Sequence, residues 1–97
     1  MKVFWTPEAS ETFNSNIDYL LIEWGESVAS DFLNRVDDVV ESIRLNPKIY
    51  PLINKNNQIR RCVVVKQITL YYRVVSFEQI DLLTFWNNYQ NPEFLKL

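Results

Sequence analysis

A single residue, Gly25, separates two long segments with helical hydrophobic periodicity, and this limits the folds available to the chain. The first segment begins after Thr6 and Pro7, which suit an N-cap and the first helical position. The second runs from about residue 26 to Leu45. Two helices with so short a connection must fold back as an antiparallel hairpin. Each has an apolar stripe, so we expect a sheet to cover the hairpin.

The second half of the chain predicts β-strands. Asn46 ends the second helix, because a residue that precedes proline avoids the α region. Three later segments are rich in β-branched and aromatic residues and are separated by breaks of hairpin length. The expected strands are Val3–Trp5, Ile59–Val65, Ile68–Val75 and Ile80–Trp86. The predicted fold class is α+β, in the order β-α-α-β-β-β, with the helical hairpin packed on an antiparallel meander in one domain, residues 1–97.

The composition favours a single cytoplasmic domain. A 97-residue chain that is 47% hydrophobic is long and apolar enough for one core. The lone Cys62 lies in an apolar run, so we interpret it as a small buried hydrophobe. The chain has no histidine, the usual acid–base group near neutral pH, and we expect no metal and no cofactor. No signal peptide and no apolar run of about 18 residues is present, so we expect a cytoplasmic protein without membrane contact.

Charge is distributed unevenly along the chain. Residues 1–50 hold four basic and nine acidic groups, a balance of −5, whereas residues 51–97 hold six basic and three acidic groups, a balance of +3. An acidic half and a basic half predict a bipolar molecule whose basic end meets something negative. The overall pI near 5.0 argues against strong nonspecific binding of nucleic acid.

Arginines on the predicted strands are the first candidates for a functional site. Arg60 and Arg61 are adjacent, so they point to opposite faces of the sheet and only one can face the helices. Together they are either a solvated strand start with a salt bridge to the acidic hairpin or an anchor of a basic face. Arg73 lies in a strand beside two tyrosines, where it either pairs with a buried carboxylate or faces a ligand. If the strands are neighbours, Arg73 converges with Arg60 or Arg61.

The C-terminal segment is too apolar for a solvated terminus. Trp86, Tyr89, Phe94 and Leu95 lie within it, so we expect it to pack back on the sheet or to form part of an interface. Its carboxamides favour polar recognition over catalysis, and they are Asn87, Asn88, Gln90 and Asn91.

A series of short motifs resembles the RelE/ParE superfamily over nearly the whole chain. The motifs are Trp5-Thr6-Pro7-Glu8-Ala9, Ala29-x-x-Phe32, Ile43-x-x-Asn46-Pro47-x-x-Tyr50-Pro51, Ile59-Arg60-Arg61, Tyr71-Tyr72-Arg73-Val74 and Asn91-Pro92. Each is weak alone, but their order and spacing together are fairly specific. The resemblance implies the toxin half of a bacterial type II toxin–antitoxin pair. Such a toxin is neutralised by a small antitoxin whose disordered segment folds onto it in a hetero-oligomer.

The superfamily has two main activities. RelE-like members cleave mRNA on the ribosome with clustered basic residues and often a C-terminal tyrosine, whereas ParE-like members inhibit DNA gyrase. This chain differs from the nucleases in three matching places. Thr69 stands where the nucleases have an arginine on the central strand, and neutral residues stand where they have a basic tail. Phe94 or Leu95, neither of which has a hydroxyl, occupies the position of the C-terminal tyrosine. The neutral tail residues are Asn87, Asn88 and Gln90. The departures favour the ParE-like branch, a toxin that binds DNA gyrase and is not an enzyme.

Two alternatives stay open. A divergent ribosome-dependent endoribonuclease would use Arg60, Arg61, Arg73 and Tyr89, and a decayed toxin would keep only antitoxin binding. The candidate contacts to the target or the antitoxin are Arg60, Arg61, Arg73, Trp86, Tyr89, Phe94 and Leu95.

Overall fold

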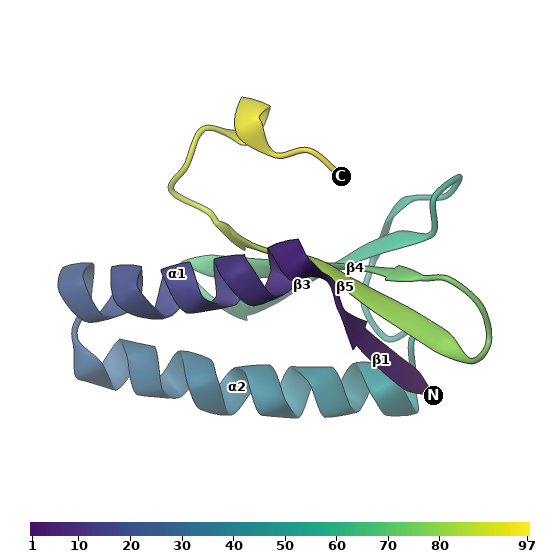
Figure 1. Ribbon diagram of the computed structural model, residues 1–97, viewed down its shortest axis with the longest axis horizontal. Coiled ribbons are helices and arrows are strands. Elements are labelled where there is room, and N and C mark those ends of the chain that lie inside the picture. Colours follow the sequence, from purple (N-terminus) through teal and green to yellow (C-terminus); the bar gives the residue numbers. More distant parts are fainter.

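The computed structural model describes residues 1–97 and consists of two helices and a five-stranded sheet (Figure 1). Its elements are β1 (Lys2–Trp5), α1 (Pro7–Glu23), α2 (Glu26–Leu45), β2 (Leu52–Asn54), β3 (Ile59–Val65), β4 (Ile68–Val74), β5 (Gln79–Asn87) and the 3₁₀ helix η1 (Pro92–Phe94). None of the helices has the length and the hydrophobicity that crossing a membrane requires.

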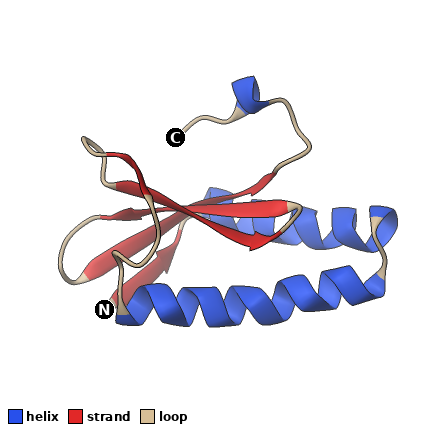
Figure 2. Ribbon diagram, turned by 180° about the vertical axis from the view of Figure 1, so that it is seen from behind, coloured by secondary structure: helices blue, strands red, loops and turns tan.

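The sheet has the strand order β1-β5-β4-β3-β2. Strands β3, β4 and β5 form the predicted antiparallel meander, and β1 pairs parallel with β5. Figure 2 shows both helices along one side of the twisted sheet. The predicted α+β class with a helical hairpin on a sheet is confirmed. The structure adds the short strand β2, antiparallel to β3, and the parallel pairing of β1 makes the sheet mixed.

Both helices begin and end for local reasons. The Thr6 hydroxyl accepts a hydrogen bond from the Ala9 amide at 3.1 Å, and Pro7 is the first helical residue, as predicted. Gly25 has φ = 97°, a left-handed conformation that L-residues with a side chain rarely adopt. It lies between Glu23 and Glu26, the ends of the two helices, and so allows the sharp reversal of the hairpin.

The hydrophobic core lies between the helices and the sheet. Phe32 and Phe85, each at most 1% exposed, contact Phe13, and Trp5 packs its ring on Phe13 and Phe85. Cys62 is 4% exposed within this core, which confirms its interpretation as a small buried hydrophobe. Burial raises the pKa of its thiol, because the thiolate loses its hydration.

We call the side of the sheet that faces away from the helices the outer face. Its residues follow from the alternation of side chains along each strand, since Cys62, Leu70 and Leu82 point into the core. The residues at the alternate positions, which are also paired across neighbouring strands, belong to the outer face. They include Arg61, Val63, Thr69, Tyr71, Arg73, Asp81 and Trp86.

Side chains of α1 cover the free edge of β5. Strand β1 pairs with β5 only as far as Leu82, so the backbone of Phe85 has no strand partner on that side. The Phe85 amide donates to Thr12 Oγ1 at 3.0 Å, and Asn16 Nδ2 donates to the Phe85 carbonyl at 2.7 Å. Thr6 Oγ1 donates to the Leu82 carbonyl at 2.7 Å. Side chains of α1 and its N-cap therefore take the place of a further strand. They form hydrogen bonds with backbone groups of β5 that have no strand partner.

Replacing Asn16 with alanine is expected to lower the free energy of unfolding by about 1–3 kcal/mol, because the Phe85 carbonyl loses its donor in a buried place. Urea denaturation followed by circular dichroism measures the loss. Asn14→Ala is the matched control, since Asn14 is exposed on the same helix. Equal losses in the two variants would contradict the bridging role of Asn16.

Candidate functional site

The outer face brings two of the three candidate arginines together. Arg61 lies opposite Tyr71 and Arg73 lies opposite Ile59, so the two arginines are diagonal neighbours on adjacent strands. Arg73 Nη2 lies 3.7 Å from Asp81 Oδ2, on the next strand along. The sequence leaves two alternatives for Arg73, a pair with a buried carboxylate or contact with a ligand. The structure shows the pair, because the Asp81 side chain is only 14% exposed. Arg61 forms no ion pair and is the free cation of this face.

Arg60 lies on the opposite side of the sheet and has a different role. It is registered against Tyr72, whose side chain is in the core. Arg60 Nη1 donates to the Tyr50 carbonyl at 2.8 Å and to the Lys48 carbonyl at 3.4 Å. These bonds tie the connection after α2 to β3. Arg61, and not Arg60, therefore lies on the same face of the sheet as Arg73.

Tyr72 strengthens the same connection. Its hydroxyl donates to the Pro47 carbonyl at 2.7 Å, and the side chain is 0% exposed. Burial raises the pKa of Tyr72 to about 12, although the nearby Arg60 charge acts in the opposite direction.

Stability is expected to fall as the pH rises from 10 through 12, because unfolded Tyr72 loses its proton near pH 10 and folded Tyr72 near 12. The folded state binds more protons in that window, so the contribution present below pH 10 is lost, by about 2–3 kcal/mol for a shift of two pKa units. Urea denaturation at pH 9 and pH 11.5 measures it. Tyr72→Phe should flatten the dependence, and an unchanged slope in that variant would refute the assignment.

Residues at the nuclease-like positions hold the tail in place. Thr69 Oγ1 donates to Asn88 Oδ1 at 2.9 Å, and Asn88 Nδ2 donates to the Lys66 carbonyl at 3.1 Å. The Tyr89 amide donates to Asn87 Oδ1 at 2.9 Å. Thr69 and these carboxamides therefore fix the point where the tail leaves the sheet.

Tyr89 is not near the paired arginine. Its ring stacks on Trp24 with 5.8 Å between the ring centroids, at the hairpin end of the helices. Ile68 pairs with Asn87 at the start of the tail, whereas Arg73 is five residues further along β4, about 17 Å away at 3.3 Å per residue. The proposed nuclease set of Arg60, Arg61, Arg73 and Tyr89 is therefore dispersed over two faces and two ends of the sheet.

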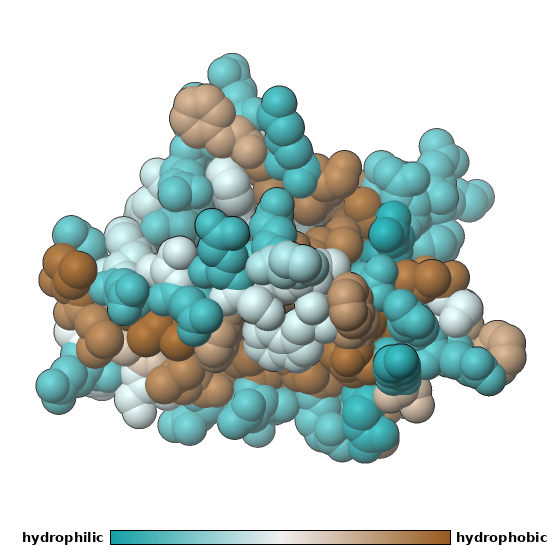
Figure 3. Space-filling view, in the orientation of Figure 1, coloured by the Kyte–Doolittle hydropathy of each residue, from teal (hydrophilic) through white to brown (hydrophobic).

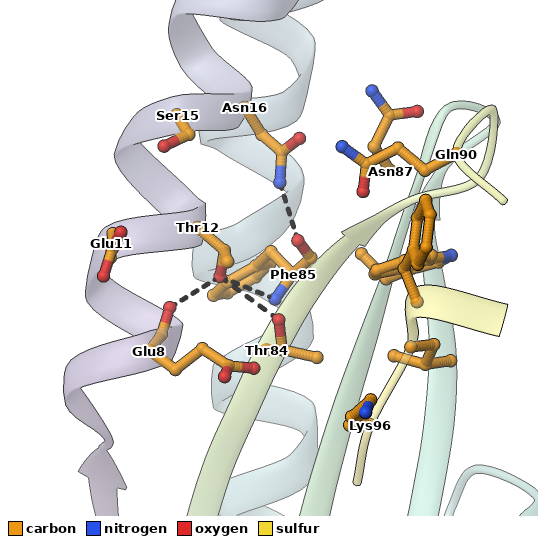
Figure 4. Close-up of a pocket in the computed structure, with 13 residues that line it drawn as sticks. Glu8, Glu11, Thr12, Ser15, Asn16, Thr84, Phe85, Asn87, Gln90 and Lys96 are labelled. Carbon is orange, nitrogen blue, oxygen red and sulfur yellow. Dashed lines mark hydrogen bonds between the residues drawn. The ribbon is translucent and has the colours of Figure 1, made fainter. Parts of the chain in front are cut away.

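A cleft separates the tail from the body of the domain. It has a volume of about 510 Å³ and lies between residues 8–16 of α1, residues 84–87 of β5 and residues 90–96 of the tail (Figure 4). We call it the tail cleft. Trp86, Phe94 and Leu95 all line it, so three of the candidate contacts predicted from the sequence meet here.

The tail forms a wall of this cleft without entering the core. Phe94 is 72% exposed, and no tail residue belongs to the buried cluster. Figure 3 shows the tail as a projection in which hydrophilic and hydrophobic residues are mixed. Of the two expectations for this segment, the exposed aromatic ring favours an interface over packing on the core.

Sequence reasoning misses two of the polar residues, Asp81 and Asn16. No local pattern links Asp81 to Arg73, and Asn16 lies inconspicuously within the apolar stripe of α1. Asn16 nevertheless carries a signal, since it is spaced three residues from Phe13 and four from Leu20, on the helix face that is otherwise apolar. A polar residue at such a position has a specific partner, which for Asn16 is the edge of β5.

Solved structures confirm the fold. A chromosomal ParDE system from P. aeruginosa is 18% identical with a TM-score of 0.61, and the match covers 90% of this chain and 95% of that one. The YoeB/ParE toxin from Agrobacterium tumefaciens is 12% identical with a TM-score of 0.63, covering 92% and 100%. The heterotetrameric YoeB–YefM toxin–antitoxin complex from Staphylococcus aureus contains a chain that is 14% identical with a TM-score of 0.62, covering 92% and 98%.

No curated protein matches the chain significantly. The family model for the ParE toxin of the type II toxin–antitoxin system parDE matches residues 3–92, which run from β1 into η1. The match includes both helices, all of the sheet except Lys2 and the outer face with its Arg73–Asp81 pair. The chain therefore belongs to the ParE toxin family of type II toxin–antitoxin systems.

Proposed function

We propose that this toxin arrests growth by binding DNA gyrase, without catalysing a reaction, and that a cognate antitoxin neutralises it in the cytoplasm. The observation that carries the proposal is the chemistry of the outer face. It presents one unpaired cation, Arg61, beside the Arg73–Asp81 pair. A single exposed cation with tyrosine beside it is suited to contact with a protein surface.

RNA cleavage needs different groups. A ribonuclease must remove a proton from the 2′-hydroxyl and stabilise charge at the phosphate. Asp81 offsets the charge of Arg73 and repels a phosphate, and Tyr89 lies at the hairpin end of the helices. The chain contains no histidine to exchange protons near neutral pH. These features support binding over cutting.

Two assays with the purified chain test the mode of action. Micromolar toxin is expected to inhibit supercoiling by purified gyrase and to leave mRNA intact on translating ribosomes. Expression without a partner should arrest growth and cause DNA-damage signalling. Codon-positioned mRNA cleavage that is lost on Arg73→Ala would assign the nuclease activity instead. Antitoxin binding without effect in either assay would identify a toxin that keeps only its antitoxin interface.

The antitoxin part of the proposal is supported by family membership. The S. aureus neighbours are YoeB–YefM complexes, and one of them is described as a heterotetrameric toxin–antitoxin complex. The expected partner is a small protein encoded beside this gene. Co-purification of the two from cells that express both, with loss of growth arrest, is the expected result.

A further inference from the structure

We propose that the tail cleft receives an extended segment of the antitoxin in which an apolar residue lies next to a lysine or arginine. This inference rests on the proposed function, because it takes the antitoxin as the partner. The cleft volume of about 510 Å³ lies within the range of ligand sites in proteins. Figure 4 shows amide side chains gathered at one end of the cleft, and Glu8 and Lys96 toward the other.

The amide end offers unused hydrogen-bonding atoms in a nearly buried place. Asn16 and Asn87 are only 5% and 8% exposed, and both line the cleft. Asn16 donates through Nδ2 to Phe85, which leaves its Oδ1 without a protein donor. Asn87 accepts through Oδ1 from Tyr89, which leaves its Nδ2 without an acceptor. One free acceptor and one free donor match the N–H and the C=O of a peptide backbone.

The charged groups of the cleft have a net negative charge. Glu8 and Glu11 line it from α1 and Lys96 lines it from the tail, and none of the three belongs to an ion pair. Their formal charges sum to −1, so the cleft attracts a cation and repels phosphate. Trp86 and Phe94 add apolar surface to the lining of the cleft. The lining therefore combines amide, apolar and net acidic groups, which a peptide backbone, an apolar side chain and a basic side chain complement.

The geometry also distinguishes this mode of binding from the addition of a strand. Thr12 and Asn16 already occupy the backbone groups of Phe85 on the free edge of β5. A peptide in the tail cleft therefore cannot pair with that part of the edge and must bond to side-chain amides. Those amides recognise main chain, whereas the charges select the basic side chain.

Calorimetric titration of the full chain with the small protein encoded beside it tests the inference. The double variant Glu8→Gln, Glu11→Gln is expected to raise Kd about tenfold, and Phe94→Ala about as much. Matched controls are Glu23→Gln on the same helix and Phe77→Ala at the exposed β4–β5 turn, each expected to stay within about twofold. Thermal unfolding of each variant verifies that it folds.

The outcomes separate the two proposals. If the wild-type chain binds and the cleft variants match their controls, the cleft assignment is overturned while the proposed function stands. If the wild-type chain does not bind the neighbouring gene product, the antitoxin part of the proposed function and this inference both fail.

Nuclear magnetic resonance gives a direct readout of the cleft. The ¹⁵N side-chain amide signals of Asn16, Asn87 and Gln90 are expected to shift with the capped peptide acetyl-Ala-Leu-Arg-Ala-amide. The same peptide with glutamate in place of arginine should leave them unmoved. Shifts caused by hexauridylate and not by the basic peptide would assign the cleft to RNA and overturn the inference.

Discussion

Replacing Arg61 with glutamate is expected to abolish growth arrest while changing the free energy of unfolding by less than about 0.5 kcal/mol. Arg61 is exposed and forms no ion pair, so the fold does not depend on its charge. It is the only arginine of the outer face whose charge is free to meet a target. Reversing that charge places an unpaired carboxylate in the interface, which should weaken target binding by tenfold or more, about 1.4 kcal/mol at least.

Two measurements decide this prediction. One is the growth of cells that express each variant at equal level, and the other is the toxin concentration that half-inhibits gyrase. Lys55→Glu is the control, because it makes the same charge change in the exposed turn between β2 and β3. Undiminished toxicity of Arg61→Glu would exclude the outer face as the contact surface. Loss of toxicity in both variants would indicate a general effect of net charge.

The neighbouring Arg60 shows why adjacent arginines must be separated in such tests. Its guanidinium donates to the carbonyls of Lys48 and Tyr50, so a carboxylate there would face two acceptors without a donor. Loss of activity in an Arg60 variant would therefore report on folding. Only the alternation of strand side chains could predict from sequence that one of the pair faces each side. The register with β4 was needed to say which.

Local patterns predicted most of the fold. The hairpin reversal at Gly25 and the meander lie where propensity and periodicity placed them, and strand ends differ by a residue, as at Val74 and Asn87. Strand β2 was missed because it has three residues, Leu52–Asn54, all exposed and without alternation. The place of β1 was not predictable from its own residues. Its parallel pairing with β5 joins segments more than 70 residues apart, and only the completed sheet defines it.

The candidate site was less accessible to sequence reasoning. Aromatic and leucine content correctly drew attention to the tail, where Trp86, Phe94 and Leu95 line a common cleft. The pairing of Arg73 with Asp81 depends on the irregular register of β4 and β5 at Tyr71, which no local pattern encodes. A β-bulge of this kind moves every later side chain by one position along the partner strand.

Replacing Phe85 with alanine is expected to lower the free energy of unfolding by about 3–5 kcal/mol, a loss typical of deleting a fully buried aromatic ring. Phe85 is 1% exposed, and its ring lies 5.4 Å from that of Trp5, 5.5 Å from Phe13 and 6.0 Å from Phe32, centroid to centroid. These rings come from β1, α1 and α2, so Phe85 joins the sheet to both helices. A cavity at this point removes apolar burial and aromatic contacts together.

Because small domains are stable by only about 5–15 kcal/mol, this loss is expected to leave Phe85→Ala partly unfolded at 37 °C. Urea denaturation should show a midpoint lower by roughly 2 M, for a denaturant slope of about 1–3 kcal/mol per molar. Phe77→Ala deletes the same ring where it is 86% exposed, and it should leave the midpoint unchanged. Phe85→Leu fills most of the cavity and should lie between the two. Similar midpoints for the Phe85→Ala and Phe77→Ala chains would show that the β5 ring does not join the layers.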